Sequence, residues 1–135
     1  MERMANVRTQ TARVLIVDDT PVTRESLNRM LTKLGYDVVG QANDGQDALD
    51  IYPKLRPDIV TMDIMMYPMD GFEATRRIKA LDPEALVMMV STKDDEESVK
   101  KAEAAGAVAY IVNPITLKTL KSKMDAISCR IKRKG

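Results

Sequence analysis

Five short apolar runs recur along the chain, and a segment with helical periodicity follows each of them. The runs lie at 13–17, 38–39, 58–62, 86–90 and 108–112. Nearly continuous apolar runs, rich in branched side chains, are typical of strands that are covered on both faces, as in parallel sheets. This alternation constrains the fold more than any other feature of the sequence.

The helical segments carry apolar residues at intervals of three and four. In the first segment these positions are Leu27, Met30, Leu31 and Leu34. Pro21 suits the first turn of this helix, and Gly35 suits its C-terminus. The other segments lie around 48–52, 72–79, 99–105 and 117–131. We expect the second helix to end at Pro53 or Pro57, because proline interrupts helical hydrogen bonding.

Five strand–helix units predict an α/β fold, with a doubly wound parallel sheet of five strands. Right-handed crossovers would place helices on both faces of the sheet. A length of 135 residues fits one domain. We expect an N-terminal tail at 1–12, the folded domain at 13–129, and a basic C-terminal tail at 130–135.

The composition excludes several classes of protein. The chain contains no histidine, which rules out histidine-based triads and zinc sites that use histidine. No apolar segment approaches the ~18 residues that would span a membrane, and the first twelve residues contain no apolar signal segment. The single cysteine, Cys129, excludes an internal disulfide and favours a reducing cytoplasm. The polar Lys-Arg-Lys-Gly ending is typical of a natural C-terminus.

The net charge of +1 conceals an asymmetry between the body of the chain and its end. Residues 118–135 carry seven Lys or Arg and one acid, whereas 1–117 carry fourteen Lys or Arg and nineteen acids. A basic end can attract nucleic acid or anionic lipid. No aromatic residues are interleaved with these cations, however, and the segment carries the apolar stripe of an amphipathic helix. We therefore interpret it as a solvated helix face, and expect neither nucleic-acid nor membrane binding.

Polar residues stand where four of the five predicted strands end. They are Asp18, Asp19, Asp63, Ser91 and Asn113. The carboxyl ends of parallel strands share one edge of the sheet, where ligands of open α/β sheets bind. Asp and Asn are also common turn residues, but three acids at one edge repel one another unless a cation lies among them. Oxygen ligands without His or Cys select a hard cation, which predicts a Mg²⁺ site.

Other phosphate-handling schemes fit the sequence poorly. The segment after the first strand contains no glycine, which excludes a P-loop or a dinucleotide-binding turn at that point. A phosphatase with an Asp nucleophile would need a second acid two residues later. Thr20 follows Asp18 at that spacing, and Met65 follows Asp63. The pattern therefore favours a protein that accepts a phosphoryl group and retains it.

Seven segments resemble the CheY-like receiver domain of two-component response regulators. They are VLIVDD at 14–19, NDG at 43–45, PDIVTMD at 57–63, MDG at 69–71, VST at 90–92, GA at 106–107 and YIVNP at 110–114. They occur in the order and spacing of the family over about residues 11–128. The resemblance implies a flavodoxin-like (βα)5 fold with strand order 2-1-3-4-5.

The resemblance also implies the chemistry of the site. Asp63 corresponds to the nucleophile that accepts a phosphoryl group from the phosphohistidine of a sensor kinase. Asp19 corresponds to a direct Mg²⁺ ligand, Asp18 to a ligand that acts through water, and Asp63 and the Met65 carbonyl to further ligands. By the same resemblance, the chain is a signalling protein that catalyses its own phosphorylation and dephosphorylation, rather than a conventional enzyme.

Signalling would then depend on a second group of residues. Ser91 corresponds to the switch hydroxyl, and Tyr110 to the aromatic that turns inward when Ser91 moves. Thr92 lies at a phosphoryl-contact position. The output surface would be the face formed by the helix at 99–105, the strand at 108–112 and the helix at 117–131. The implied partners are a sensor histidine kinase or phosphotransfer protein and a downstream protein in two-component or chemotaxis signalling.

Two residues depart from the family pattern. Asn113 stands where the family has a lysine that contacts the phosphoryl group. This loss is expected to weaken switching by ~1–2 kcal/mol, about tenfold in a two-state equilibrium. Tyr67 stands where proline is expected, and we predict that it narrows the site. We also expect a cis Asn113–Pro114 bond, and consider that Lys93 partly replaces the missing lysine or is simply a solvated loop residue.

Two alternatives remain open at this point. Asn113 and Tyr67 favour a degenerate receiver that binds proteins independently of phosphorylation. An Asp-nucleophile phosphatase is a second alternative, which the missing second acid argues against. Most of the ten methionines are predicted to fill the core. Those at 65, 66 and 69 are predicted to form a docking patch for the kinase.

Overall fold

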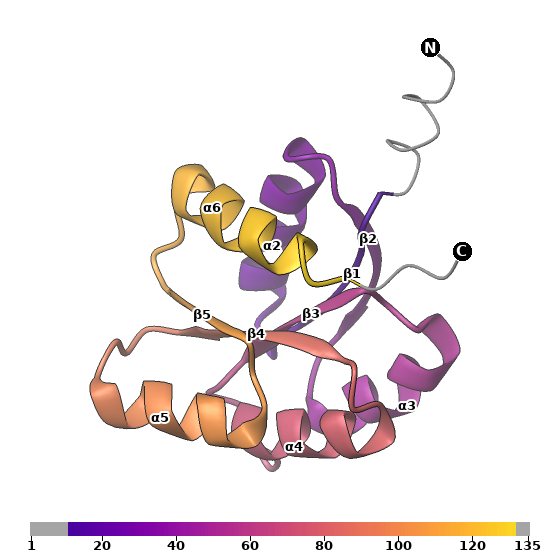
Figure 1. The fold of residues 1–135 in the computed structure, drawn as a ribbon, viewed down its shortest axis with the longest axis vertical. Coiled ribbons are helices and arrows are strands. Elements are labelled where there is room, and N and C mark those ends of the chain that lie inside the picture. Colours follow the sequence, from indigo (N-terminus) through magenta and orange to yellow (C-terminus); the bar gives the residue numbers. More distant parts are fainter. Residues whose placement is uncertain (1–10, 132–135) are drawn as a thin grey trace.

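Five strands alternate with five helices in the computed structural model, which describes residues 11–131 (Figure 1). The strands are β1 (Arg13–Val17), β2 (Asp37–Ala42), β3 (Ile59–Asp63), β4 (Leu86–Ser91) and β5 (Ala109–Val112). The helices are α2 (Pro21–Lys33), α3 (Gly45–Leu55), α4 (Gly71–Leu81), α5 (Glu96–Ala105) and α6 (Leu117–Ser128). The predicted tails at 1–12 and 130–135 lie mostly outside the described residues.

All four strand pairs are parallel, and the strands lie in the order β2-β1-β3-β4-β5. Both the predicted fold class and the predicted strand order are therefore confirmed. The chain first adds a strand on one side of β1 and then continues on the other side from β3 to β5. The order consequently reverses between β1 and β3, so their carboxyl ends flank the point where ligands of such sheets bind.

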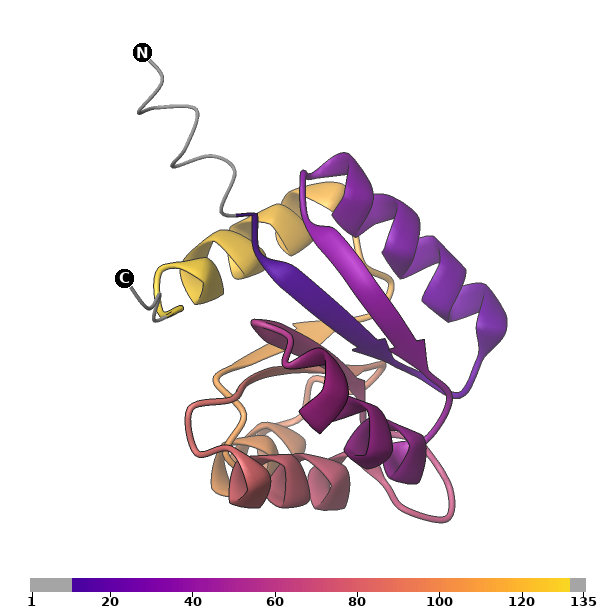
Figure 2. The ribbon, with the colours of Figure 1, turned by 90° about the vertical axis from the view of Figure 1, so that its right-hand side faces the viewer.

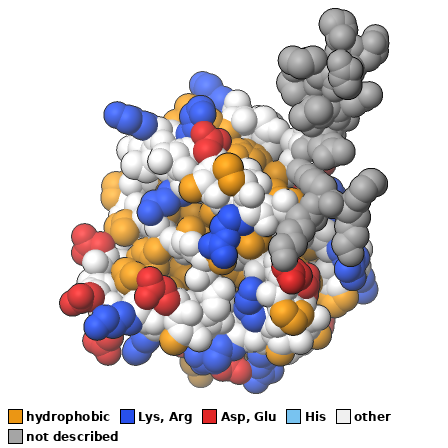
Figure 3. Space-filling model, viewed as in Figure 1, with side chains coloured by type: hydrophobic (Ala, Val, Ile, Leu, Met, Phe, Trp, Pro, Cys, Tyr) orange, Lys and Arg blue, Asp and Glu red, His pale blue; other side chains and the backbone are white. Residues whose placement is uncertain are grey.

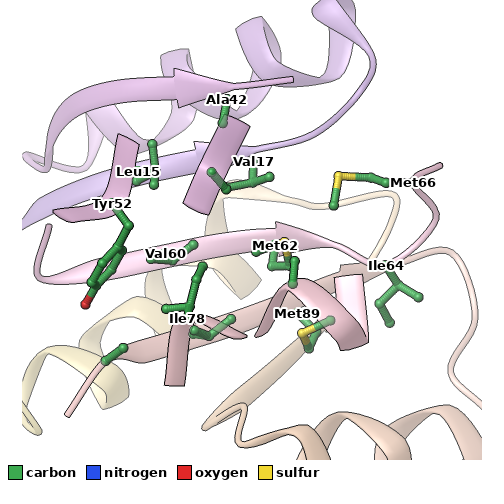
Figure 4. Packing of buried hydrophobic residues seen from close by; sticks show 14 of the residues in the cluster. Leu15, Val17, Ala42, Tyr52, Val60, Met62, Ile64, Met66, Ile78 and Met89 are labelled. Carbon is green, nitrogen blue, oxygen red and sulfur yellow. The ribbon is translucent and has the colours of Figure 1, made fainter. Parts of the chain in front are cut away.

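Two apolar cores fill the space on either side of the sheet. Helices α2 and α6 cover one face, and α3, α4 and α5 cover the other (Figure 2). Successive residues of β1 contribute to opposite cores. Val14 and Ile16 belong to the core with α2 and α6, whereas Leu15 and Val17 belong to the core with the other helices (Figure 4). Because both faces of these strands are buried, their sequences are unbroken apolar runs.

Polar side chains define where four helices begin. Asp44, Asp70 and Asp95 each accept a hydrogen bond from the main-chain N–H three residues later, and Thr116 forms a reciprocal capping box with Thr119. These bonds satisfy N–H groups that have no partner within the helix. Helix α2 lacks such a side-chain cap and begins with Pro21, whose missing N–H removes one of the unpaired donors.

Two predicted boundaries were wrong, and one prediction with two alternatives was decided. β2 does not stop at Gly40 but extends to Ala42. After a shift of register, Gly40 pairs with Leu15, and the pairing with β1 continues to Val17 and Ala42. Of the two predicted ends of α3, Pro53 lies inside the helix, whereas Pro57 follows directly after its C-cap, Arg56, so the second alternative is confirmed. The last helix ends at Ser128 rather than continuing to Ile131.

The methionines divide between the core and the surface. Met62, Met88, Met89 and Met124 are fully buried, as predicted. The predicted docking patch is wrong for two of its three members: Met66 is buried, and Met69 packs against the core beside α3. The Met65 side chain is 62% exposed. No helix in residues 11–131 is long and apolar enough to cross a membrane.

Thr61, in the centre of β3, offers a test of the core. Its Oγ1 is buried and has no hydrogen-bond partner among the described residues. A buried hydroxyl without a partner loses its hydration without compensation. We therefore expect Thr61→Val to raise the free energy of unfolding by about 1 kcal/mol, measured by urea denaturation. Thr75→Val is the control, because the buried Thr75 hydroxyl has a partner in Met89 Sδ at 3.4 Å. An equal gain in both variants would contradict this explanation.

Candidate functional site

Three carboxylates meet at the carboxyl ends of β1 and β3. Asp18 and Asp19 directly follow β1, and Asp63 is the last residue of β3. One carboxylate oxygen from each of the three residues lies within 4.8 Å of the others. Asp18 is buried, Asp63 is half-buried and Asp19 is exposed. The site is therefore open to solvent on one side and closed by protein on the other.

Hydrogen bonds to the main chain hold Asp18 and Asp63 in place. The Thr20 N–H donates to Asp18 Oδ1 at 2.8 Å, and the Asp18 N–H continues the ladder to the Ala42 carbonyl at 3.1 Å. The Met65 N–H donates to Asp63 Oδ1 at 3.2 Å. Each bond involves the main chain of the adjoining loop or strand, so the carboxylates are positioned before any ligand binds.

The acids disfavour one another's ionisation. Burial raises the pKa of Asp63 to about 7, and the negative charges of Asp18 and Asp19 add to this increase. The hydrogen bond from the Met65 N–H opposes it, because that bond stabilises the ionised form. Burial likewise raises the pKa of Asp18, against the hydrogen bond from Thr20. A bound cation would relieve this repulsion, so the electrostatics of the site favour cation binding.

The chemistry of the donors indicates which cation fits. All three side chains offer oxygen, the chain has no histidine, and the only cysteine, Cys129, is exposed next to the last turn of α6. Oxygen donors without nitrogen or sulfur suit hard divalent ions such as Mg²⁺. The Met65 main chain lies in the loop that directly follows β3, and its N–H donates to Asp63 Oδ1, which keeps it beside the site.

Gly71 packs against the backbone of Asp63 and Ile64. A Cβ at this position would lie 2.3 Å from the Asp63 carbonyl oxygen and 2.7 Å from Ile64 Cα. The Gly71 N–H also donates to the Ile64 carbonyl at 2.9 Å. The start of α4 therefore packs directly on the backbone that carries Asp63, and only glycine permits this approach.

Ser91, Lys93 and Tyr110 form a connected group beside the acids. Ser91 is buried at the end of β4, and its Oγ accepts a hydrogen bond from the Lys93 N–H at 3.0 Å. The Lys93 carbonyl accepts a hydrogen bond from the Tyr110 hydroxyl at 2.7 Å. One residue of main chain thus links the Ser91 hydroxyl to the Tyr110 ring. The Lys93 side chain is exposed.

Asn113 and Thr92 occupy the adjoining edge of the site. The Asn113 N–H donates to the Ser91 carbonyl at 2.7 Å, and the Asn113–Pro114 bond is cis, as expected. Thr92 and Asn113 line a hollow with residues of α2, among them Val22. Within residues 11–131, neither side chain hydrogen-bonds the three acids.

Tyr67 does not narrow the site as predicted. Its side chain is 87% exposed, so it covers almost none of the neighbouring protein. The Tyr67–Pro68 bond is cis. The tyrosine ring extends into solvent.

Arg24 lies at the site but was not predicted from the sequence. Its side chain is half-buried in the first turn of α2, and Nη1 donates to the Asp18 carbonyl at 2.6 Å. The predicted site residues lie at the ends of strands, whereas Arg24 lies five positions beyond Asp19 in a helix. Only the packing of α2 against the end of β1 brings its charge to the site.

The reversed strand order, with an acidic site at the point of reversal, defines a class of signalling domain. Residues 14–125 match the response regulator receiver domain family, and the chain belongs to this family. It is 40% identical to the chemotaxis protein CheY of Thermotoga maritima over 116 residues, covering 86% of this chain and 97% of that protein. It is 39% identical to CheY of Treponema pallidum, covering 85% and 81% of the two chains.

A solved structure supports the same assignment. The chain resembles a structure of the CheX–CheY–BeF3–Mg²⁺ complex from Borrelia burgdorferi, with a TM-score of 0.81 and 33% identity. The similarity covers 90% of each chain. The chain is therefore a CheY-like receiver domain of the kind that serves two-component signalling.

Proposed function

We propose that this protein accepts a phosphoryl group on Asp63 with the help of Mg²⁺ and thereby changes its affinity for a protein partner. The gathering of Asp18, Asp19 and Asp63 within 4.8 Å carries this proposal. The proposed donor is the phosphohistidine of a sensor kinase or phosphotransfer protein. Among the similar proteins, the complex from Borrelia burgdorferi contains both BeF3 and Mg²⁺.

The proposed reaction is an in-line displacement. A carboxylate oxygen of Asp63 attacks phosphorus while the bond from phosphorus to the histidine nitrogen breaks, and the imidazole leaves. Asp19 and the Met65 carbonyl would hold Mg²⁺ directly, and Asp18 would hold it through water. When bound, the ion offsets negative charge and favours the ionised, nucleophilic form of Asp63. The chain itself supplies the aligned carboxylate and the Met65 N–H beside it.

The signal would pass from Ser91 to Tyr110. In the proposed switch the Ser91 hydroxyl turns toward the phosphoryl group and releases the Lys93 N–H. The loop that carries the Lys93 carbonyl, the acceptor of the Tyr110 hydroxyl, would then shift. Thr92 and Asn113 adjoin the same edge, and Asn113 offers a neutral contact in place of the family lysine. This difference is expected to make the switch weaker.

The proposed output surface is the face formed by α5, β5 and α6. A groove of about 400 Å³ runs across it, lined by apolar residues such as Val99 and Tyr110 and by the cations Lys123 and Arg130. Figure 3 shows this face, with hydrophobic side chains between α5 and α6 and Lys and Arg side chains among them. We propose a cytoplasmic downstream protein as the partner, and neither nucleic acid nor a membrane.

Intact mass after incubation with acetyl phosphate and Mg²⁺ tests the proposal. We expect one phosphoryl adduct that requires Mg²⁺ and is absent in Asp63→Asn, because the amide cannot act as the nucleophile. The folded state of Asp63→Asn is verified by circular dichroism. If the folded wild-type protein forms no adduct with either acetyl phosphate or a kinase donor, the proposal is wrong. The protein would then be a phosphorylation-independent binding module.

Lys93→Ala tests whether Lys93 compensates for Asn113. If its ammonium reaches the phosphoryl group, its removal should slow phosphorylation by acetyl phosphate roughly tenfold, the effect of losing one charged hydrogen bond. Lys100→Ala, which removes an exposed lysine from α5, is the matched control. Unchanged phosphorylation rate and phosphoryl lifetime in Lys93→Ala would identify Lys93 as a solvated loop residue.

A further inference from the structure

Arg24 places a positive charge beside the three carboxylates without contacting a carboxylate oxygen. Its Nη1 donates to the Asp18 main-chain carbonyl at 2.6 Å, and its own N–H donates to the Thr20 carbonyl at 3.0 Å. Among the Lys and Arg side chains of residues 11–131, it alone hydrogen-bonds any of the three acids. The carboxylate oxygens thus remain available to a metal ion, although a cation already lies next to them.

The position of Asp18 does not depend on this contact. The Asp18 N–H is bonded to the Ala42 carbonyl at 3.1 Å, and its carboxylate is bonded by the Thr20 N–H at 2.8 Å. β1 itself lies between β2 and β3 in the middle of the sheet. The strand and the turn therefore already hold Asp18, and the principal contribution of Arg24 is its charge.

This charge has opposite effects in two states of the protein. Without a metal ion it offsets the repulsion among the acids, consistent with its effect of lowering the pKa of Asp18. With a divalent ion at the site, the same charge repels that ion. Coulomb's law in water gives about a fivefold change in affinity for a unit charge about 8 Å from a divalent ion.

We infer that Arg24 is a built-in counter-charge of the acidic site, which stabilises the metal-free protein and weakens its binding of Mg²⁺. The second half of this inference rests on the proposed function, because it takes Mg²⁺ as the ion that the site binds. The first half concerns only the three carboxylates. The charge of Arg24 would reduce the destabilising repulsion among the acids in the metal-free protein. It would also reduce the affinity of the site for the ion.

Three variants separate the charge of Arg24 from other effects. Arg24→Met removes the charge and retains an apolar stem of similar width. Arg24→Lys retains the charge on a different head group. Arg29→Met is the matched control, because Arg29 lies on the same helix with 77% of its side chain exposed and, among residues 11–131, pairs only with Glu25 at 3.1 Å. For each, Mg²⁺ affinity is measured by calorimetry and thermal unfolding is followed in EDTA.

We expect Arg24→Met to bind Mg²⁺ about fivefold more tightly and to unfold about 3 °C lower in EDTA than the wild type. Arg24→Lys and Arg29→Met should remain close to the wild type in both measurements. In an Asp63→Asn background, the loss of stability caused by Arg24→Met should shrink, because less repulsion then remains for Arg24 to offset.

Equal or weaker Mg²⁺ binding by Arg24→Met would overturn the inference and assign Arg24 a role in positioning Asp18. An undiminished loss of stability in the Asp63→Asn background would overturn it as well. If the wild type fails to bind Mg²⁺, the proposed function fails along with the metal half of the inference. The unfolding experiment in EDTA still decides whether Arg24 acts as a counter-charge.

Discussion

Asp63→Asn is expected to stabilise the metal-free protein by about 2 kcal/mol at pH 8, raising its unfolding temperature by about 6 °C. The folded protein raises the pKa of Asp63 to about 7, chiefly through burial and the charge of Asp18. The full shift corresponds to about 4 kcal/mol, and the smaller value allows for solvent screening of this half-exposed group. Asparagine has a similar shape and no charge, so it removes this cost.

The sign of the pH dependence follows from the raised pKa. The unfolded carboxyl ionises near pH 4 and the folded one near pH 7. In the wild type, the contribution of Asp63 to the free energy of unfolding is therefore fully present below pH 4 and is lost as the pH rises through 7. The advantage of Asp63→Asn should be small at pH 4, increase between pH 4 and 7, and level off above pH 8.

Thermal unfolding in EDTA across this pH range provides the measurement. Asp50→Asn is a suitable control, because Asp50 is exposed on α3 and its replacement should change stability by less than about 0.5 kcal/mol. Mg²⁺ should then stabilise the wild type more than Asp63→Asn, reducing the difference between them. A difference that is constant from pH 4 to pH 8 would show that ionisation of Asp63 is not the cause.

Gly71→Ala is expected to have the largest effect on stability, a loss of about 3 kcal/mol. The new Cβ would lie 2.3 Å from the Asp63 carbonyl oxygen and 2.9 Å from its carbonyl carbon. Both atoms belong to the backbone of a central strand, which cannot move without disturbing β1 and β4. We also expect phosphorylation by acetyl phosphate to slow about a hundredfold, because displacement of the nucleophile by ~1 Å is sufficient for such a loss.

Gly45→Ala is the matched control for this substitution. Both glycines are the first residue of a helix that follows an Asp cap. A Cβ at Gly45 would also meet a close neighbour, Met69 Sδ at 2.7 Å, but this atom belongs to a flexible side chain that can turn aside. Gly45→Ala should therefore lose less than about 1 kcal/mol. Comparable losses in the two variants, measured by urea denaturation, would show that contact with the Asp63 backbone is not decisive.

Much of the fold was predictable because burial leaves a direct pattern in the sequence. Strands covered on both faces must be apolar throughout, and this requirement located β1, β3, β4 and β5 to within one residue. β2 was less predictable, because it lies at the edge of the sheet and contains Gly40 and the polar Gln41. The strand continues to Ala42 because it pairs with β1 across a register shift. This pairing depends on both strands and cannot be recognised from the sequence of one of them.

The core of the site was predictable for a similar reason. Parallel strands bring their carboxyl ends together, so acids at the ends of the first and third strands had to meet if the fold was right. The positions of Met66, Met69 and Tyr67 were not predictable, because a loop has no periodicity to indicate which side chains face inward. Two of these residues pack inward, whereas Tyr67 extends into solvent.

The sequence by itself determined the order of strands and helices, the sheet edge at which the acids converge, and the donor chemistry that suits a hard cation. These properties depend on residue type and spacing along the chain. Only the tertiary structure decided that Arg24 lies against the Asp18 carbonyl, that Gly71 packs on Asp63, and that the Lys93 main chain links Ser91 to Tyr110. Those contacts join segments that are distant in sequence or depend on side-chain direction, and they exist only once the helices have packed on the sheet.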